Sequence, residues 1–375
     1  MTPALLPDPD AAALGEVVRE FLARHGDTDA VLRGQPDDVP ARRRVWRRFA
    51  GELGAAALDL PEHLGGAGAS FREVAVVAEE MGRSLSGLPW LSTSVMALGL
   101  LAEAGDEELP ARLAGGAETA AVALLDAPAV TDRTAGPVTG EPAPGGGWRV
   151  TGTKNLVVDG ATADVLLVAA ASPDGPVVLA VEAAAPGVTA APARTLDPTR
   201  PLATLGFRDS PARLVTGPDT AGAVLERVRD RTRAALACEQ TGGTAAALDM
   251  SVRHAGDRIQ FGRPIGTFQA IKHRCADMLV RLEAARSASL WAAACAADDR
   301  DQLRTAAATA ALVCGEAYSW VAGENVQVHG GIGFTWEHPA HLHVRRAASS
   351  RVLPEGAPGG VEDLLDDILE PARAR

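Results

Sequence analysis

The sequence predicts an α+β protein with three consecutive parts: an N-terminal α-helical domain, a middle antiparallel β domain and a C-terminal bundle of helices. Amphipathic helical spacing recurs through about the first 115 residues. Short apolar runs separated by Pro and Gly then fill about 118–218, and long Ala-rich stretches with few turn residues follow. We place the boundaries at 1–116, 117–220 and 221–375, because 375 residues exceed the usual size of one domain.

The first two parts differ in their spacing of apolar residues. ALGEVVREFLARH and SFREVAVVAEEMGRSL have the spacing of helices, and Pro61, Gly65 and Gly66 make LDLPEHLGGAGAS between them a loop. In the middle part, four apolar runs have the length of strands: AAVALLD, WRVTGTKNLVVDG, ADVLLVAAA and PVVLAVE. AGPVTGEPAPGGG is expected to be a hairpin loop or a mobile excursion.

The third part predicts helices at about 232–258, 267–298 and 301–328, whose alanines and glycines permit close helix packing. FGRPIG separates the first two, and Thr267 is expected to cap the second helix. Arg258 and Arg263 flank this turn, so two guanidinium groups could stand beside helix N-terminal amides and bind phosphate oxygens. The alternative is an ordinary surface turn with solvated arginines.

A Gly-rich stretch, ENVQVHGGIGFTWEHPAHLHVRRA, ends the last long helix. Its glycines resemble a dinucleotide fingerprint, but no strand precedes them, so a Rossmann site is excluded. Gly330 and Gly331 more simply let the main chain approach a ligand or another chain, and Gln327 could donate or accept a hydrogen bond there. The histidines that follow lack a fixed helical pair and enclose a proline, so we expect packing or interface roles and no metal: His338, His341 and His343.

Composition narrows the class of protein. A formal net charge of -12 argues against nucleic acid or an anionic membrane surface as the main partner. No apolar run is long enough for a membrane span and no signal peptide is evident, so a cytoplasmic protein is expected. The four cysteines show no metal or disulfide spacing and are expected to be reduced core residues.

Four stretches together carry a resemblance to the acyl-CoA dehydrogenase family over essentially the whole chain: LGAAALDLPEHLGGAG with EEMGR, WRVTGTKNLVVDGATADVLLVAA, DRIQFGRPIGTFQAIKHRCADM and QVHGGIGFTWEHPAHLHVRRA. The resemblance implies a C-terminal four-helix domain and assembly as a dimer of dimers. It also implies FAD as cofactor, an acyl-CoA or acyl-carrier thioester as substrate, and electron-transfer flavoprotein or a similar acceptor.

The same resemblance implies roles for six residues. In the family, the turn holding Arg258 and Phe261 and the loop holding Gln327, Gly330 and Gly331 reach across a dimer interface. They meet the diphosphate and adenosine half of an FAD that the neighbouring subunit mainly binds. Arg258 would supply charge to the pyrophosphate, and Gln269 would support the turn.

The sequence departs from the family pattern at the catalytic base. The family's usual Glu-Gly-Thr segment is replaced by SSRVLPEGAPGG, in which Glu355 lies about one residue out of register. Some relatives carry the base on the first long C-terminal helix, where this chain has Thr232. Glu239 lies two turns further along the same face, either as a base or as a solvated or paired helix carboxylate.

The expected flavin-ring contacts are also altered. LLDAPAVTDRTAGPVTG replaces the family's Thr-Glu-Pro and Gly-Ser-Asp run, and Leu156 and Val158 stand where an aromatic residue and a threonine meet the ring. Valine cannot donate a hydrogen bond. The leading hypothesis is therefore a partner-type subunit, as in heteromeric actinobacterial acyl-CoA dehydrogenases, that completes the FAD site of a homologous subunit. The alternatives are a self-sufficient homotetramer with Glu355 as base and a non-catalytic scaffold without cofactor; the acyl group stays open.

Overall fold

Segments that are far apart in the sequence assemble into two units. The computed structural model describes residues 5, 9–26, 28–35, 38–124, 126 and 137–355. Unit 1 comprises Met1–Asp37, Ser70–Gly87 and Arg233–Arg375, and unit 2 comprises Asp38–Ala69 and Leu88–Thr232. The domain boundaries expected from the sequence follow chain order instead, so they stay predictions.

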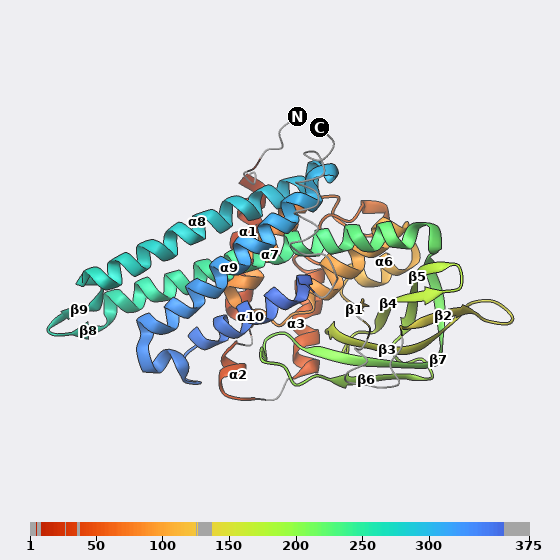
Figure 1. Cartoon of the computed structure of the whole chain (residues 1–375), viewed down its shortest axis with the longest axis horizontal. Coiled ribbons are helices and arrows are strands. Elements are labelled where there is room, and N and C mark those ends of the chain that lie inside the picture. The colour runs from red at the N-terminus through yellow and green to blue at the C-terminus, as the bar shows by residue number, and fades with distance from the viewer. Residues whose placement is uncertain are drawn as a thin grey trace, which may run out of the picture. The chain divides into compact units, whose positions relative to one another are not determined.

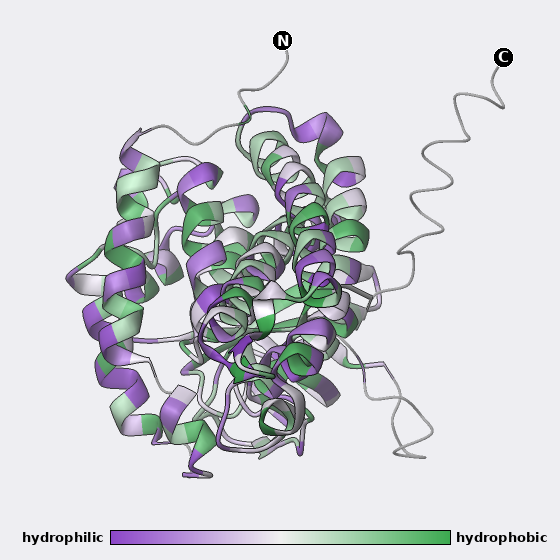
Figure 2. Ribbon diagram, turned by 90° about the vertical axis from the view of Figure 1, so that its left-hand side faces the viewer, coloured by the Kyte–Doolittle hydropathy of each residue, from purple (hydrophilic) through white to green (hydrophobic). Residues whose placement is uncertain are grey.

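Unit 1 is built almost entirely of helices (Figure 1). Its long helices pack lengthwise, α8 on α9 and α9 on α10, while α1 packs on α4. Along the ribbons, hydrophilic and hydrophobic residues alternate, as expected for helices with one buried face (Figure 2). The elements are α1 (Pro9–His25), α2 (Thr28–Leu32), α4 (Phe71–Ser84), the second part of α7 (Pro218–Asp257), β8 (Ile259–Gln260), β9 (Arg263–Pro264), η3 (Ile265–Thr267), α8 (Gln269–Asp298), α9 (Arg300–His329), η4 (Gly330–Phe334) and α10 (Ala340–Glu355).

Two glycines bring α4 and α7 into backbone contact. A Cβ atom added to Gly82 would lie 1.8 Å from the carbonyl oxygen of Glu239, and one added to Gly242 would lie 1.8 Å from that of Glu79. Real Cβ atoms never come so near an oxygen, so each helix needs a glycine where the other passes. The sequence-based expectation that glycines permit close helix approach is therefore confirmed at this crossing.

Unit 2 holds a seven-stranded sheet and the helices that cover it (Figure 1). The strand order is β1-β4-β2-β3-β7-β5, β6 pairs with β7, and β4 also pairs with β5, which closes the sheet on itself. The elements are α3 (Val39–Gly51), η1 (Glu62–Leu64), η2 (Leu91–Leu98), α5 (Gly99–Ala104), α6 (Glu108–Ala114), β1 (Ala120–Ala123), β2 (Thr139–Pro142), β3 (Trp148–Val158), β4 (Val165–Ser172), β5 (Gly175–Glu182), β6 (Val188–Pro192), β7 (Leu202–Thr216) and the first part of α7.

Strand β4 is apolar throughout because both of its faces are buried. Val165 and Leu167 pack with leucines of the covering helices, whereas Leu166 and Val168 pack inside the closed sheet. A strand buried on both sides reads as one apolar run, which is why ADVLLVAAA lacks alternation.

The predicted order of helical, β and helical parts is confirmed, with four helices (α7 to α10) in the C-terminal part, but three local expectations need correction. The sheet is not wholly antiparallel, because β1 pairs in parallel with β4. The stretch expected to be a hairpin loop or a mobile excursion contains strand β2 as well as the turn from Ala143 to Gly147 that joins β2 to β3 in a hairpin. Thr267 does not cap α8: it belongs to η3, its Oγ1 donates to the carbonyl of Pro264 at 2.7 Å, and Phe268 precedes the helix.

Candidate functional site

The interruption between α7 and α8 is a two-stranded hairpin, β8 with β9. Gln260 pairs with Arg263, and the tip residues Phe261 and Gly262 have φ angles of 54° and 78°. A left-handed φ at phenylalanine costs of the order of 1 kcal/mol. The tip directs the ring outward, leaving Phe261 91% exposed. The ring of Phe261 is therefore accessible to another molecule.

The two arginines of this hairpin differ in their surroundings. The Arg263 guanidinium lies over the ring of Phe268, 4.3 Å from its centroid. Arg258 is exposed, and within the described part of the chain no carboxylate pairs with its guanidinium. Arg258 is therefore the hairpin cation that is available to an anionic ligand.

The Gly-rich loop follows α9 with a left-handed turn. Gly330 has a φ of 65°, and a Cβ atom added to Gly330 or Gly331 would meet no other atom within 4 Å. Gly333 is different, because its Cβ would lie 2.9 Å from the Cβ of His329. Gly330 and Gly331 thus leave open space over the main chain, whereas Gly333 serves internal packing.

Three stacked histidines join the hairpin and the loop. His329, the last residue of α9, lies 4.3 Å from His254 of α7 and 4.3 Å from His338, measured between ring centroids. His254 stands one helical turn before Arg258, and His329 directly precedes Gly330. The hairpin and the loop therefore lie at the same end of unit 1 (Figure 1). Below we name this the hairpin end, defined as residues 254–269 and 325–341.

All six residues predicted to contact the cofactor lie at the hairpin end. Gln269 opens α8 and Gln327 lies in the last turn of α9, and both side chains are exposed. The hairpin end also includes Arg258, Phe261 and the two open glycines. An unpaired guanidinium beside accessible main chain fits a diphosphate chemically, although direct cofactor contact by these residues stays a prediction.

The candidate bases are placed less favourably. Glu239 is 3% exposed, and Arg346 of α10 donates to its Oε1 at 3.1 Å and to the carbonyl of Ser86 at 3.1 Å. This geometry favours the paired-carboxylate interpretation of Glu239 over a role as base. Thr232 donates through Oγ1 to the carbonyl of Val228 at 2.7 Å. Glu355 is the last residue of α10, and its side chain lies outside the described part.

Arg231, the residue before Thr232, forms an ion pair within unit 2. Arg231 donates to both oxygens of Asp59, at 2.5 and 2.9 Å, and through Nε to the carbonyl of Val95 at 2.9 Å. Val95 belongs to η2, a π-helix, and such helices are frequent at functional sites. Here the guanidinium fills the space over Gly99 of the following helix. The sequence alone did not reveal this pairing.

Strand β3 carries the two residues expected at the flavin ring. Leu156 has a φ of 53° at an irregularity in the pairing with β7 and is 38% exposed, whereas Val158 is 6% exposed. Neither side chain can donate or accept a hydrogen bond. The segment predicted to replace the Thr-Glu-Pro and Gly-Ser-Asp run lies mostly outside the described residues.

A buried lysine on β3 escaped the sequence analysis. The Lys154 ammonium donates to Asp126 Oδ1 at 2.7 Å and to the carbonyl of Leu124 at 3.0 Å. Burial lowers the pKa of Lys154. The signal was available, because Lys154 falls on an inward-facing position of a strand and is one of only two lysines in the chain.

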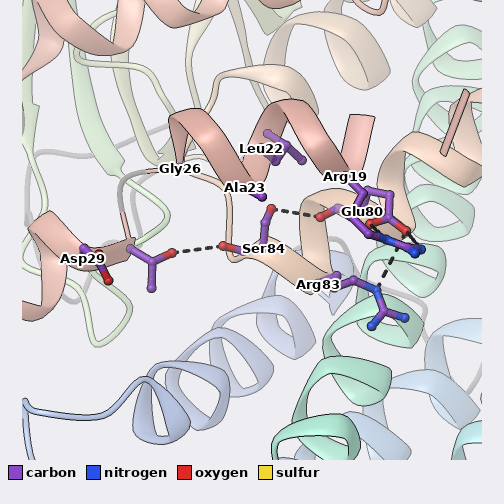
Figure 3. A pocket seen from close by; sticks show the side chains of 9 residues that line it. Arg19, Leu22, Ala23, Gly26, Asp29, Glu80, Arg83 and Ser84 are labelled. Atoms are coloured by element: carbon purple, nitrogen blue, oxygen red, sulfur yellow. Dashed lines mark hydrogen bonds and ion pairs between the residues drawn. The ribbon is translucent and has the colours of Figure 1, made fainter. Parts of the chain in front are cut away.

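Unit 1 also has a polar pocket that holds none of the predicted site residues (Figure 3). The Glu80 carboxylate in its wall accepts two hydrogen bonds from Arg19, at 2.6 and 2.9 Å, and Arg83 pairs with Asp249. Because these charges are already matched inside the chain, the pocket offers no clear preference for a charged ligand. It is lined by Arg19, Leu22, Ala23, Gly26, Thr28, Asp29, Glu80, Arg83 and Ser84.

Comparison with known proteins identifies the scaffold. Residues 8–116 match the acyl-CoA dehydrogenase N-terminal domain, and residues 223–357 match the acyl-CoA dehydrogenase C-terminal domain. Acyl-CoA dehydrogenase IpdE2 of Mycobacterium tuberculosis is 35% identical over 367 residues, 98% of this chain and 99% of the relative. This chain belongs to the acyl-CoA dehydrogenase family.

Solved structures agree with this assignment. The Tcur3481-Tcur3483 steroid ACAD is 33% identical, with a TM-score of 0.84 over 97% of this chain and 99% of that chain. The ChsE4-ChsE5 complex from Mycobacterium tuberculosis is 29% identical, with a TM-score of 0.83 over 98% of this chain and 99% of that chain. Butyryl-CoA dehydrogenase from Megasphaera elsdenii, 21% identical with a TM-score of 0.86, shows the same fold.

Family membership confirms several predictions made from the sequence. The fold class, the enzyme class of oxidoreductases acting on CH–CH groups, and FAD as the family's cofactor are those expected. Among the described residues, no helix is both long and apolar enough to cross a membrane. The open main chain and the Arg258 guanidinium of the hairpin end suit a diphosphate chemically, whereas Leu156 and Val158 of β3 offer no hydrogen-bonding side chain at the positions predicted to meet the flavin ring.

Proposed function

We propose that this chain is the partner subunit of a heteromeric acyl-CoA dehydrogenase, in which it completes an FAD site held mainly by a homologous subunit. The carrying observation is an asymmetry: the hairpin end is open and carries the unpaired Arg258, whereas Val158 and Leu156 leave the ring positions of β3 without a polar contact. The relative solved as the ChsE4-ChsE5 complex, which matches over nearly the whole chain, supports this interpretation.

In this proposal each residue has a binding task. Arg258 faces the diphosphate, Gly330 and Gly331 let the main chain approach it, and Gln327 supplies an amide. Bound FAD supplies a two-electron acceptor for dehydrogenation of the acyl thioester. The homologous subunit supplies the carboxylate that takes the α-proton, because in this chain Glu239 is bonded to Arg346 and Glu355 stands out of register with the family's Glu-Gly-Thr segment.

Two further assignments belong to the same proposal. The substrate is an acyl-CoA. A steroid-linked acyl-CoA is the first to test, since a 33% identical structure is a steroid ACAD. An electron-transfer flavoprotein or a similar carrier reoxidises the flavin. A cytoplasmic location stays a prediction from the sequence.

Co-expression with homologous subunits from the same genome tests the proposal. We expect the complex to purify yellow and active, and this chain alone to purify without flavin, by absorbance of the released cofactor. In the complex, Arg258→Gln should weaken flavin retention about ten-fold, because a charge-assisted hydrogen bond is lost. Arg253→Gln, at an exposed arginine in the last turns of α7, is the matched control and should leave retention unchanged.

The same experiment separates the alternatives. Full flavin occupancy and turnover by this chain alone would refute the partner role and favour the homotetramer, in which Glu355→Gln should abolish turnover without changing the flavin spectrum. A colourless preparation with every homologous subunit would favour the scaffold.

A further inference from the structure

The hairpin follows α7 and the Gly-rich loop follows α9. Because the two segments are far apart in the sequence, contacts between α7 and α9 must set their relative position. Two contacts link α7 to α9 at this end. Ser251 donates to Asn325 Oδ1 at 2.8 Å, and one helical turn further on, His254 stacks on His329 with 30° between the ring planes. In the second contact, His254 stands one helical turn before Arg258, and His329 directly precedes Gly330.

The proton positions in this stack are fixed by the hydrogen bonds that the rings make. His329 Nδ1 lies 2.8 Å from the carbonyl of Asn325, and because a carbonyl only accepts, this nitrogen carries the proton. His338 is the opposite tautomer: its Nδ1 accepts from the main-chain N–H of Ala340 at 3.2 Å, at the start of α10. His338 therefore cannot take a proton on Nδ1 without losing this bond.

The surroundings favour the neutral form of two of these rings, His338 and His254. Burial lowers the pKa of His338 to about 4, with His329, His254 and His341 as further causes. Burial also lowers the pKa of His254, helped by His329 and Arg258 and opposed by Asp257. Around the stack, then, α7 contributes Arg258 and Asp257, and α10 contributes His341 with Arg345 bonded to it.

We propose that His329, stacked between His254 and His338, is a positioning residue that fixes the Gly330–Gly331 turn against the hairpin of Arg258. It touches no cofactor itself: its ring sets the distance between the two segments that do. This inference rests on the proposed function for the identity of the ligand, but its structural content concerns this chain alone.

Hydrogen–deuterium exchange of the purified full chain tests the structural content without any partner. In His329→Ala, amides of residues 330–334 should exchange about ten-fold faster, since two ring contacts are lost. His329→Phe keeps a flat ring and should restore slow exchange. Wild-type exchange in His329→Ala, or failure of His329→Phe to restore it, would overturn the inference.

A matched control separates positioning from general stability. His343, on α10, is also buried, but its Nδ1 lies 2.9 Å from Tyr318 Oη and it is not in the stack. His343→Phe should lower the thermal midpoint and leave exchange of residues 330–334, relative to the core helices, as in wild type. An equal loosening of the loop in His343→Phe would show that any damage to the bundle has this effect, and the inference would fall.

The pH profile gives an independent readout. Between pH 7 and pH 4, exchange of residues 330–334, corrected for its intrinsic rate, should accelerate in the wild type as His338 gains a proton. His338→Phe cannot gain one at this position and should show a shallower profile, since only His254 of the two stacked rings with a lowered pKa is left; an unchanged slope would contradict the inference. In the co-expressed complex, His329→Ala should retain flavin about ten-fold less well than wild type and His329→Phe equally well, so a complex that never binds flavin defeats the proposed function while the exchange data stand.

Discussion

The hairpin end of unit 1 and strand β3 of unit 2 hold the two sets of residues predicted from the sequence to meet FAD, and they differ in accessibility. At the hairpin end, Phe261 is 91% exposed and the main chain at Gly330 and Gly331 is uncovered. On β3, Val158 is buried and Lys154 is tied to Asp126. The difference shows that the two predicted contact regions are not equally suited to a polar ligand: one offers open main chain and a cation, the other only apolar side chains at the two predicted positions.

The largest expected effect tests whether Glu239 of unit 1 acts as a base. Glu239→Gln removes the carboxylate charge that lies 3.1 Å from the buried Arg346 guanidinium and should cost roughly 3 kcal/mol of unfolding free energy, measured by urea denaturation. Glu283→Gln, an exposed carboxylate on α8, should cost less than about 0.5 kcal/mol. A stable Glu239→Gln protein whose complex loses turnover would give this chain a catalytic carboxylate and break the contrast.

The next effect compares two kinds of glycine. Gly242→Ala should destabilise the chain by about 3 kcal/mol, because the new Cβ would meet the carbonyl oxygen of Glu79 on α4. Gly331→Ala has open space around its Cβ and should leave the thermal midpoint within about 2 °C of wild type. In the complex, however, Gly331→Ala should weaken flavin retention. Normal retention would mean that no ligand approaches this turn closely.

A smaller effect tests how much of the β3 difference lies in one side chain. Val158→Thr adds a hydroxyl at a position that is 6% exposed and should cost about 1–2 kcal/mol. If the ring site is lost over several residues, the variant chain alone should still purify without flavin. Bound flavin in the lone variant, measured by absorbance, would reduce the contrast to a single substitution.

The smallest effect is a pH dependence confined to unit 1. The pKa of His338 is about 4 in the folded chain, below its ordinary value of 6.5. Between these values the unfolded chain binds a proton that the folded chain does not, so the free energy of unfolding should fall as the pH drops through this window. Urea denaturation from pH 7 to pH 4 should show a shallower decline in His338→Phe. An identical decline would assign the effect to other groups.

Regular periodicity explains which parts of the fold were predictable. The strands of the middle part and the long helices follow from apolar spacing and turn residues, because local pattern and burial agree there. Thr267 was misassigned as a helix cap because its hydroxyl is already bonded to the carbonyl of Pro264 within η3. The parallel pairing of β1 with β4 joins segments about 45 residues apart, and no local pattern records it.

The candidate site was predictable only where a motif carried it. Arg258 and the two open glycines were singled out from local sequence and Phe261 only through the family resemblance, and the structure gathers all four at one end of unit 1. The histidine stack was missed because His254 and His329 meet only through tertiary packing. Glu239 could not be assigned from the sequence, since the pairing that explains it involves Arg346 on another helix.

The backbone contact between α4 and α7 also bears on how the chain is made. Gly82 is synthesised about 160 residues before Gly242. At 5–20 residues per second, the face of α4 that contacts α7 therefore stays uncovered for roughly 10–30 s. Unit 1 can close only after the ribosome has synthesised all of unit 2. During that interval the nascent N-terminal helices present an uncovered apolar surface. Chaperones that bind such surfaces can then bind the nascent chain.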